Sequence, residues 1–217
     1  SQPQKQKPLK ALIAGLSEMN RVSPAHQGFS GFPLVEVEVE KISSMITSSV
    51  LLNQSFTTTA LENALNSSSF PIVHLATHSE IHQDSNFNSK DTFILAWDER
   101  ITPKDFEELL SSRKQEKLNP IELLVLSACK SADGNNQTPF GFPGFALRSR
   151  VRSILGSLWF LNGETTTELM VQFYQEFTQR NVTKAEALRR AQLTLLKEPG
   201  YQATFFWAPF VLIGDWR

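Results

Sequence analysis

Apolar residues along this chain gather in short continuous runs that are bounded by turn-forming residues. The clearest are residues 10–18 (KALIAGLSE), 71–77 (PIVHLAT) and 121–128 (IELLVLSA). Runs of this length without polar alternation are typical of strands that are covered on both faces. Shorter strand candidates are residues 49–53, 91–97, 152–159 and 208–216. The pattern therefore predicts a buried, largely parallel sheet.

Residues 34–46 (LVEVEVEKISSMI) are ambiguous between two periodicities. Strict alternation of apolar residues and glutamate favours a strand, whereas apolar residues also recur along one face of a helix. That helical face comprises Val35, Val39, Ile42 and Ile46. We interpret the segment as a helix.

Helix-start signals support further helices between the strands. Thr59 followed by Glu62 predicts a capping box that opens a helix to about Asn66, and Thr102 followed by Pro103 predicts an N-cap and first helical residue. Additional helices are expected at residues 145–151, 164–179 and 184–197. Strands that alternate with helices of this length indicate an α/β fold, with a mostly parallel central sheet and helices on both faces.

Length, charge and cysteine content narrow the range of functions. The 217 residues are 41% hydrophobic, so we expect one domain over 10–217 after a polar linker or chain end at 1–9. The net charge is −1, with 21 basic and 22 acidic residues, which argues against nucleic-acid and membrane partners. No apolar run approaches the length of a membrane span. A single cysteine forms no internal disulfide and favours a reducing compartment, so the cytoplasm is expected.

The one cysteine, Cys129, directly follows the apolar run 121–128, and His78 directly follows the run 71–77. In open α/β sheets the binding crevice lies outside the carboxyl ends of the strands, so adjacent parallel strands would bring both side chains to one edge. A neighbouring imidazole can take the proton of a thiol and leave the more nucleophilic thiolate. The two residues lie 51 positions apart (129 − 78), close to the histidine-to-cysteine spacing of caspases.

Five segments together resemble the CHAT domains, which are caspase-like cysteine peptidase domains often fused to TPR repeats. They are 74–79 (HLATHS), 124–134 (LVLSACKSADG), 151–174, 184–196 and 207–215 (WAPFVLIGD). The resemblance implies a caspase-like sheet and a His78/Cys129 dyad that hydrolyses peptide bonds through a thioester, with no cofactor and no metal. It implies an oxyanion hole formed by the backbone N–H groups of Ser79 and Cys129. It also implies a polypeptide substrate or partner protein, and TPR repeats in the same longer chain.

Two residues depart from the pattern of that family. Ser79 follows the histidine where the family usually has glycine, and Lys130 follows the cysteine where it usually has an acidic residue. If the backbone at residue 79 required a positive φ, serine would resist it at a cost of about 1 kcal/mol. A catalytically silent caspase-like module that acts as a regulatory interaction domain therefore stays open as the alternative to a peptidase.

Substrate preference is left open by the sequence. Base-preferring relatives carry an aspartate two residues before the cysteine, and here that residue is Ser127. Asp84 and Asp133 are loop carboxylates that could receive a basic side chain, and Trp159 could line a hydrophobic subsite. The polar segment 130–141 (KSADGNNQTPFG) is a lid, a self-cleavage site or a plain surface loop.

Two other functions for these residues are disfavoured. His74, His78 and His82 have the spacing of metal ligands on a helix, but the strand character of 71–77 argues against a metal site. A redox-sensing role for Cys129 lacks a resolving cysteine within the chain.

Overall fold

A six-stranded sheet forms the centre of the computed structural model, which describes residues 9–80, 92–111, 119–128, 141–149, 151–159 and 162–217. In spatial order the strands are β2 (Thr47–Leu52), β1 (Lys10–Gly15), β3 (Ile72–Ala76), β7 (Leu123–Ser127), β8 (Ser153–Ser157) and β9 (Phe210–Gly214). Every neighbouring pair is parallel except β8–β9, which is antiparallel. The predicted α/β class with a mostly parallel sheet is confirmed.

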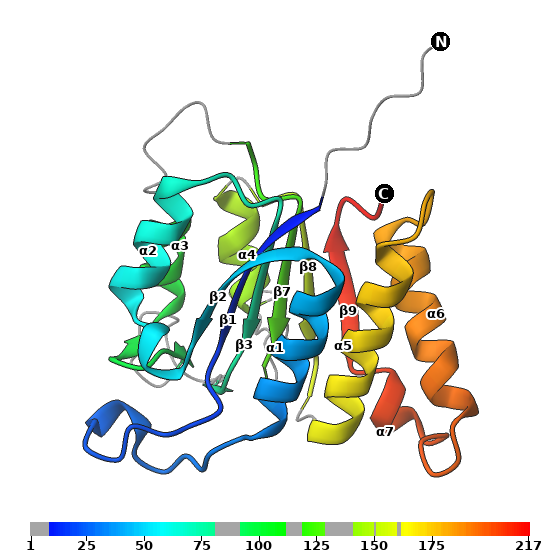
Figure 1. Ribbon diagram of the computed structural model, residues 1–217, viewed down its shortest axis with the longest axis horizontal. Helices are drawn as coiled ribbons and strands as arrows, with labels where there is room; N and C mark the ends of the chain where they lie inside the picture. The colour runs from blue at the N-terminus through cyan, green and yellow to red at the C-terminus, as the bar shows by residue number, and fades with distance from the viewer. Residues whose placement is uncertain (1–8, 81–91, 112–118, 129–140, 150, 160–161) are drawn as a thin grey trace.

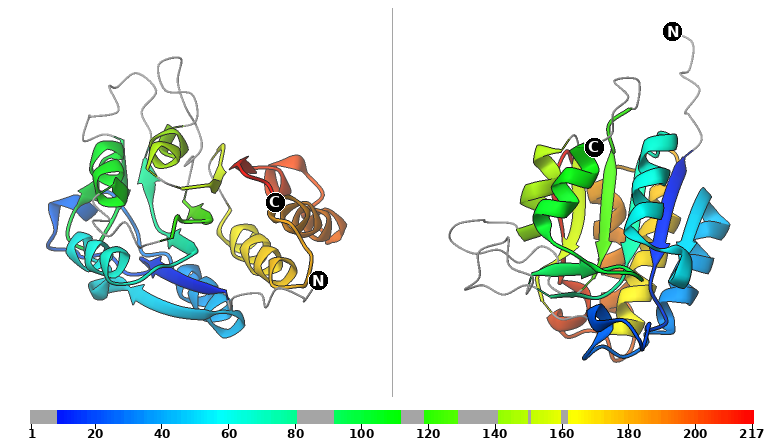
Figure 2. Two further views of the ribbon diagram at one scale, coloured as in Figure 1. Left: turned by 90° about the horizontal axis from the view of Figure 1, so that it is seen from above. Right: turned by 90° about the vertical axis from the view of Figure 1, so that its left-hand side faces the viewer.

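Two helical layers enclose the sheet (Figures 1 and 2). The helices are α1 (Leu34–Met45), α2 (Thr58–Ser67), α3 (Pro103–Ser111), α4 (Gly141–Arg148), α5 (Gly163–Phe177), α6 (Lys184–Lys197) and α7 (Thr204–Trp207). Buried residues of α2, α3 and α4 pack on one face, and those of α1, α5 and α6 pack on the other. No helix in the described ranges has the length and apolar character that crossing a membrane requires.

The ambiguous segment 34–46 is helical over Leu34–Met45 (α1). The four apolar residues that defined its predicted face, Val35, Val39, Ile42 and Ile46, are all buried. Burial of this face against the sheet explains why the helix forms despite the β-branched residues, because tertiary packing outweighs intrinsic propensity.

The predicted start of α2 is wrong by two residues. Its N-cap is Thr57, whose hydroxyl accepts a hydrogen bond from the Ala60 N–H at 3.1 Å. The Asp98 carboxylate, distant in sequence, accepts from the Thr58 N–H at 3.0 Å and satisfies another donor of the first turn. The residues near Thr59 alone could not predict this contact, because Asp98 lies forty residues from Thr58 in the sequence. The predicted start of α3 is confirmed: its first residue is Pro103, and the Thr102 hydroxyl accepts from the Asp105 N–H at 3.3 Å.

Short elements account for the other differences from prediction. Within the expected strand 91–97, the described residues 92–97 contain β5 (Phe93–Leu95), which belongs to a separate antiparallel sheet with β4 (Ser79–Glu80) and β6 (Arg100–Ile101). Helix α4 begins at Gly141, four residues before its predicted start, and the four-residue α7 was not predicted. Elements of two to four residues are too short to show a hydrophobic period.

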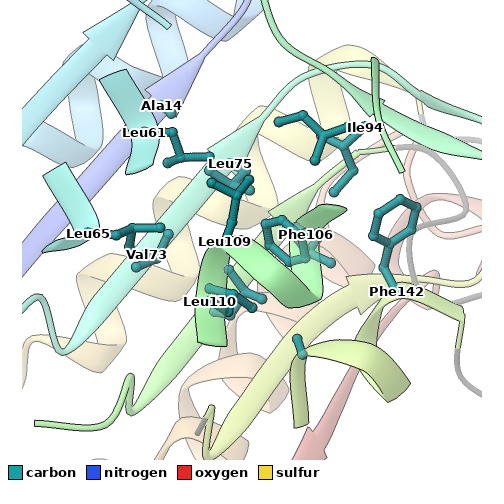
Figure 3. Packing of buried hydrophobic residues seen from close by; sticks show 14 of the residues in the cluster. Ala14, Leu61, Leu65, Val73, Leu75, Ile94, Phe106, Leu109, Leu110 and Phe142 are labelled. Atoms are coloured by element: carbon teal, nitrogen blue, oxygen red, sulfur yellow. The ribbon is translucent and has the colours of Figure 1, made fainter. Parts of the chain in front are cut away.

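The core beneath α2, α3 and α4 is a close-packed aliphatic and aromatic cluster (Figure 3). Leu61 and Leu65 of α2 lie beside Val73 and Leu75 of β3. Phe106 of α3 is 1% exposed, and its ring contacts that of Phe142 edge-on, with 6.1 Å between centroids. The large buried rings therefore attach α3 and α4 to the same face of the sheet.

We expect Phe106→Ala to lower the free energy of unfolding by about 3–5 kcal/mol, because the substitution leaves a cavity in this cluster. Urea denaturation followed by circular dichroism measures the change. Phe205→Ala is the matched control, since that ring is 50% exposed and its loss should cost less than about 0.5 kcal/mol. Equal effects of the two substitutions would contradict the assignment of Phe106 to the core.

Candidate active site

The register of β3 and β7 brings the carboxyl ends of these two strands to one edge of the sheet. Ala76 pairs with Ser127, and the Thr77 N–H donates to the Ser127 carbonyl at 3.3 Å. In the sequence, His78 follows Ala76 by two residues, and Cys129 follows Ser127 by two residues. Cys129 itself is outside the described residues, and the chain is described up to Ala128. Since the strands are parallel, both segments leave the sheet at its carboxyl edge.

The main chain of His78 is held by the small second sheet. The Leu95 N–H donates to the His78 carbonyl at 2.9 Å, and the hydroxyl of Thr77 donates to the Leu95 carbonyl at 2.7 Å. Leu95 is the last residue of β5 and is fully buried. The histidine therefore sits where the central sheet meets the β4–β5–β6 sheet, on a backbone fixed from both sides.

The His78 side chain is oriented by the loop that follows β1. Its Nε2 atom lies 3.0 Å from the carbonyl oxygen of Ser30. Because a carbonyl only accepts, Nε2 carries the proton of the neutral ring and Nδ1 carries the lone pair. The Phe29 and Phe32 rings lie beside the imidazole, with centroid distances of 5.0 and 6.3 Å. Nδ1 is thus the nitrogen that can accept a proton from a substrate or a neighbouring residue.

Burial lowers the pKa of His78 below its ordinary value of 6.5. The hydrogen bond to the Ser30 carbonyl opposes this effect by favouring the charged ring, and the nearby His26 adds to the lowering. The net result is an imidazole that is neutral near pH 7, as a general base must be.

Ser79 has an extended backbone and does not need the conformational freedom of glycine. It lies in β4 opposite Ile94, and the described non-glycine residues with positive φ are Asn53 (53°) and Asn181 (63°). The bond between Leu95 and His78 makes their pair a hydrogen-bonded one, so the next pair along the ladder is non-hydrogen-bonded. The Ser79 N–H is consequently directed to the side of β4 away from β5.

The other predicted site residues are distributed along the same edge or fall outside the described ranges. Ser127 is the last residue of β7 and is 7% exposed. Trp159 follows β8, and its indole N–H donates to the Phe205 carbonyl of α7 at 3.3 Å. Asp84, Asp133, Lys130 and the segment 130–140 lie outside the described residues. Ser127 and His78 therefore share one edge through adjacent strands, while Trp159 lies at the end of the next strand.

His74 belongs to a buried network on the opposite side of β3 from α2. Its Nε2 atom lies 2.9 Å from a carboxylate oxygen of Glu38, and its Nδ1 atom lies 3.1 Å from the hydroxyl of Tyr174. The three side chains are at most 2% exposed. Burial and the neighbouring Glu38 raise the pKa of Tyr174 well above its ordinary value, so its hydroxyl stays protonated. Both ring nitrogens of His74 are thus engaged in joining β3 to α1 and α5.

Sequence reasoning missed the residues that orient His78. Ser30 contributes a main-chain carbonyl, which every residue type carries, so no side-chain signal identifies it. Phe29 and Phe32 lie in a segment rich in glycine, proline and serine that the pattern marks only as a loop. The length of that loop was the available hint, because long structured loops are often functional.

Comparison with known proteins gives one family and a set of similar folds. Residues 1–215 match the model of the CHAT domain. The Arg-specific cysteine proteinase gingipain R from Porphyromonas gingivalis superimposes with a TM-score of 0.62 at 12% identity, over 95% of this chain and 46% of that one. A secreted C11 cysteine protease from Bacteroides thetaiotaomicron, solved with an irreversible peptide inhibitor, gives 0.55 at 10% identity, over 96% and 66%.

The Saccharomyces cerevisiae separase–securin complex gives a TM-score of 0.54 at 14% identity, over 96% of this chain and 12% of that one. No protein of curated function matches the sequence. The chain spans less than half the length of gingipain R and about an eighth of the separase chain. At sequence identities of 10–14%, the structural similarity to these proteases establishes that the chain has a caspase-like fold.

We expect an NMR titration to give His78 a midpoint below 6.5, as its burial dictates. A histidine whose folded-state pKa is lowered binds its proton more readily when unfolded. His78 therefore lowers the free energy of unfolding as the pH falls below about 6.5, where the unfolded chain takes up the proton first. His78→Gln should flatten this part of the profile of unfolding free energy against pH. A midpoint above 6.5 would contradict the described environment.

Proposed function

Because the chain belongs to the CHAT domain family, we propose that it is a cysteine endopeptidase in which His78 is the general base and Cys129 is the nucleophile. The observation that carries the proposal is the tautomer and orientation of the His78 ring, which its hydrogen bond to Ser30 determines. Its Nε2–H is committed to the Ser30 carbonyl, so Nδ1 is the basic atom at the edge where β7 leads into Cys129. The solved structures with this fold named above include cysteine proteases, which supports the same chemistry.

In the proposed reaction, Nδ1 of His78 takes the proton of the Cys129 thiol, and the thiolate attacks the carbonyl carbon of the scissile peptide bond. The carbonyl oxygen becomes an oxyanion, which accepts hydrogen bonds from the N–H groups of Ser79 and Cys129. The imidazolium then gives its proton to the leaving nitrogen, the C–N bond breaks, and a thioester remains. Water, deprotonated by His78, attacks the thioester to release the carboxylic acid and restore the thiol.

The half-buried position of His78 suits both proton transfers. Phe29 and Phe32 pack beside the ring, and the burial of His78 favours the neutral base before the reaction. The Ser30 carbonyl favours the charged ring after it has taken the thiol proton. The two influences act in opposite directions, so neither protonation state is strongly disfavoured.

We infer that the substrate is a polypeptide and assign no preference for the residue at the cleavage point. The printed name of gingipain R states an arginine specificity, which belongs to that enzyme. In this chain Ser127 stands at the position where base-preferring relatives carry aspartate, and it is almost fully buried at the end of β7.

Alkylation of the single cysteine tests the proposed dyad directly. At pH 6 we expect iodoacetamide to label Cys129 at least about tenfold faster than a model thiol, since a paired imidazole lowers a thiol pKa. His78→Ala should return the rate to that of the model thiol. Intact-mass spectrometry measures labelling without ambiguity, because the chain has one cysteine. Lys104→Ala, at a side chain that is 62% exposed, is the surface control.

Cleavage of a peptide library by the full-length protein tests turnover, and Cys129→Ala should abolish it while leaving the denaturation midpoint nearly unchanged. A folded protein whose thiol reacts no faster than a model thiol, with or without His78, would refute the peptidase proposal. It would support the regulatory interaction module instead.

Substitutions at Ser79 separate its side chain from its backbone donor. Ser79→Gly should change the cleavage rate by less than about threefold, because the backbone there is already extended and glycine relieves no strain. Ser79→Pro removes the N–H and should lower the rate roughly 100- to 1,000-fold, the usual loss for one oxyanion donor. Denaturation curves must show that both variants fold. Equal rates for the two variants would exclude Ser79 from the oxyanion hole.

A further inference from the structure

The loop between β1 and α1 carries the carbonyl that orients His78, and it is closed at its base. The Phe32 N–H donates to the Ser17 carbonyl at 2.7 Å. The side-chain oxygen of Asn53 accepts from the Ser17 N–H at 2.8 Å and from the Glu18 N–H at 3.0 Å. These bonds fix both ends of the loop next to the ends of β1 and β2, and Ser30 lies two residues before the closing contact.

The tip of the same loop is held by a second histidine, His26, which is 4% exposed. It ends the 3₁₀ turn Pro24–His26, and its Nδ1 atom accepts from the Asn20 N–H at 2.9 Å. Its Nε2 atom lies 3.0 and 3.1 Å from the carbonyl oxygens of Ala96 and Trp97. His26 therefore links the loop to the segment that follows β5.

The partners of His26 fix the position of its proton. A backbone N–H only donates, so Nδ1 must carry a lone pair, and carbonyls only accept, so Nε2 must carry the hydrogen. One neutral tautomer satisfies all three contacts. Since the ring of His26 is buried, any other arrangement of its proton leaves a polar group without a partner in the interior, which is unfavourable.

The residues that bind His26 are continuous with the residue that holds the main chain of His78. Ala96 directly follows Leu95, whose N–H donates to the His78 carbonyl. The segment is itself fixed, because the Trp97 N–H donates to the Phe56 carbonyl at 2.9 Å. His26 thus holds the loop that orients the His78 ring against the strand that orients the His78 backbone.

Two further contacts support this attachment. The Arg100 Nε–H donates to the Ala25 carbonyl at 3.0 Å, and its guanidinium lies over the Phe93 ring at 4.2 Å. Phe29 contacts Phe93 edge-on, with 5.8 Å between centroids, and it also contacts the His78 ring. The Phe29 N–H donates to the His26 carbonyl at 3.1 Å, which connects Phe29 to the tip of the loop.

We propose that His26 is a positioning residue for His78: by attaching the loop tip to Ala96 and Trp97, it keeps the Ser30 carbonyl against Nε2 of His78 and so keeps the lone pair on Nδ1. The effect on reaction rate rests on the proposed function. The tautomer of His78 does not, because it is a property of the resting protein.

The test is a ¹⁵N NMR measurement of the ring nitrogens in protein labelled at its four histidines. In the wild-type protein at pH 7.5, His26 and His78 should both show a protonated Nε2 and an unprotonated Nδ1. His26→Phe keeps a ring beside Trp97 but removes the hydrogen bonds, and should convert His78 to a mixture of tautomers. His26→Gln retains one acceptor and one donor and should restore at least half of the wild-type signature.

Tyr174→Phe is the matched control for general loss of stability. It removes a buried hydroxyl that contacts His74 in the core cluster on the other face of the sheet. It should leave the His78 tautomer unchanged. In the alkylation assay at pH 6, His26→Phe should lower the Cys129 rate to a value between those of the wild-type protein and His78→Ala, because part of the population keeps the lone pair on Nδ1. His26→Gln should recover most of it.

The outcomes separate this inference from the proposed function. A folded His26→Phe protein that keeps the His78 signature, or a Tyr174→Phe protein that loses it, would overturn the role of His26. If His26→Phe does not fold, a wild-type His26 with a protonated Nδ1 would overturn it equally. A changed His78 tautomer with an unchanged alkylation rate would support the positioning role and contradict the dyad.

Discussion

The hydrogen bond from the Nε2–H of His78 to the Ser30 carbonyl is the interaction on which the candidate site depends. It joins a residue beyond β3 to a loop that begins after β1, two neighbouring strands of the sheet. Without it, the imidazole could carry its proton on either nitrogen and rotate about its side-chain bonds. With it, the neutral ring has one tautomer and one orientation in the resting protein.

The parallel sheet makes this contact possible. Because β1, β3 and β7 run in the same direction, their carboxyl ends lie at one edge of the sheet, although the strands are far apart in sequence (Figure 1). Each strand contributes a different component: the loop after β1 gives the carbonyl, the segment after β3 gives the imidazole, and β7 leads to the cysteine. The small β4–β5–β6 sheet then fixes the backbone of the segment after β3, which the central sheet no longer supports.

The sequence was sufficient to predict the strands and helices whose apolar residues recur with a regular period. The apolar runs at 71–77 and 121–128 are strands, as their continuous pattern predicted. Segment 34–46 fitted two periodicities, and the helical one is correct because its apolar face is buried. The sequence was insufficient where the local structure depends on a hydrogen bond to a residue far away in the chain. The start of α2 depends on Asp98, forty residues away, and the orientation of His78 depends on a main-chain atom of Ser30. The assignment of Cys129 as nucleophile stays a prediction.

The two sides of β3 face chemically different environments. Ile72, His74 and Ala76 contribute to the α1 and α5 side, while Val73 and Leu75 pack under α2. Side chains of a strand alternate, so inserting or deleting a single residue within β3 would exchange these sets. An imidazole would enter an apolar layer of aliphatic and aromatic side chains, and the carboxylate of Glu38 would lose its partner in the interior. The length of this strand is therefore under stronger constraint than the identity of most of its residues.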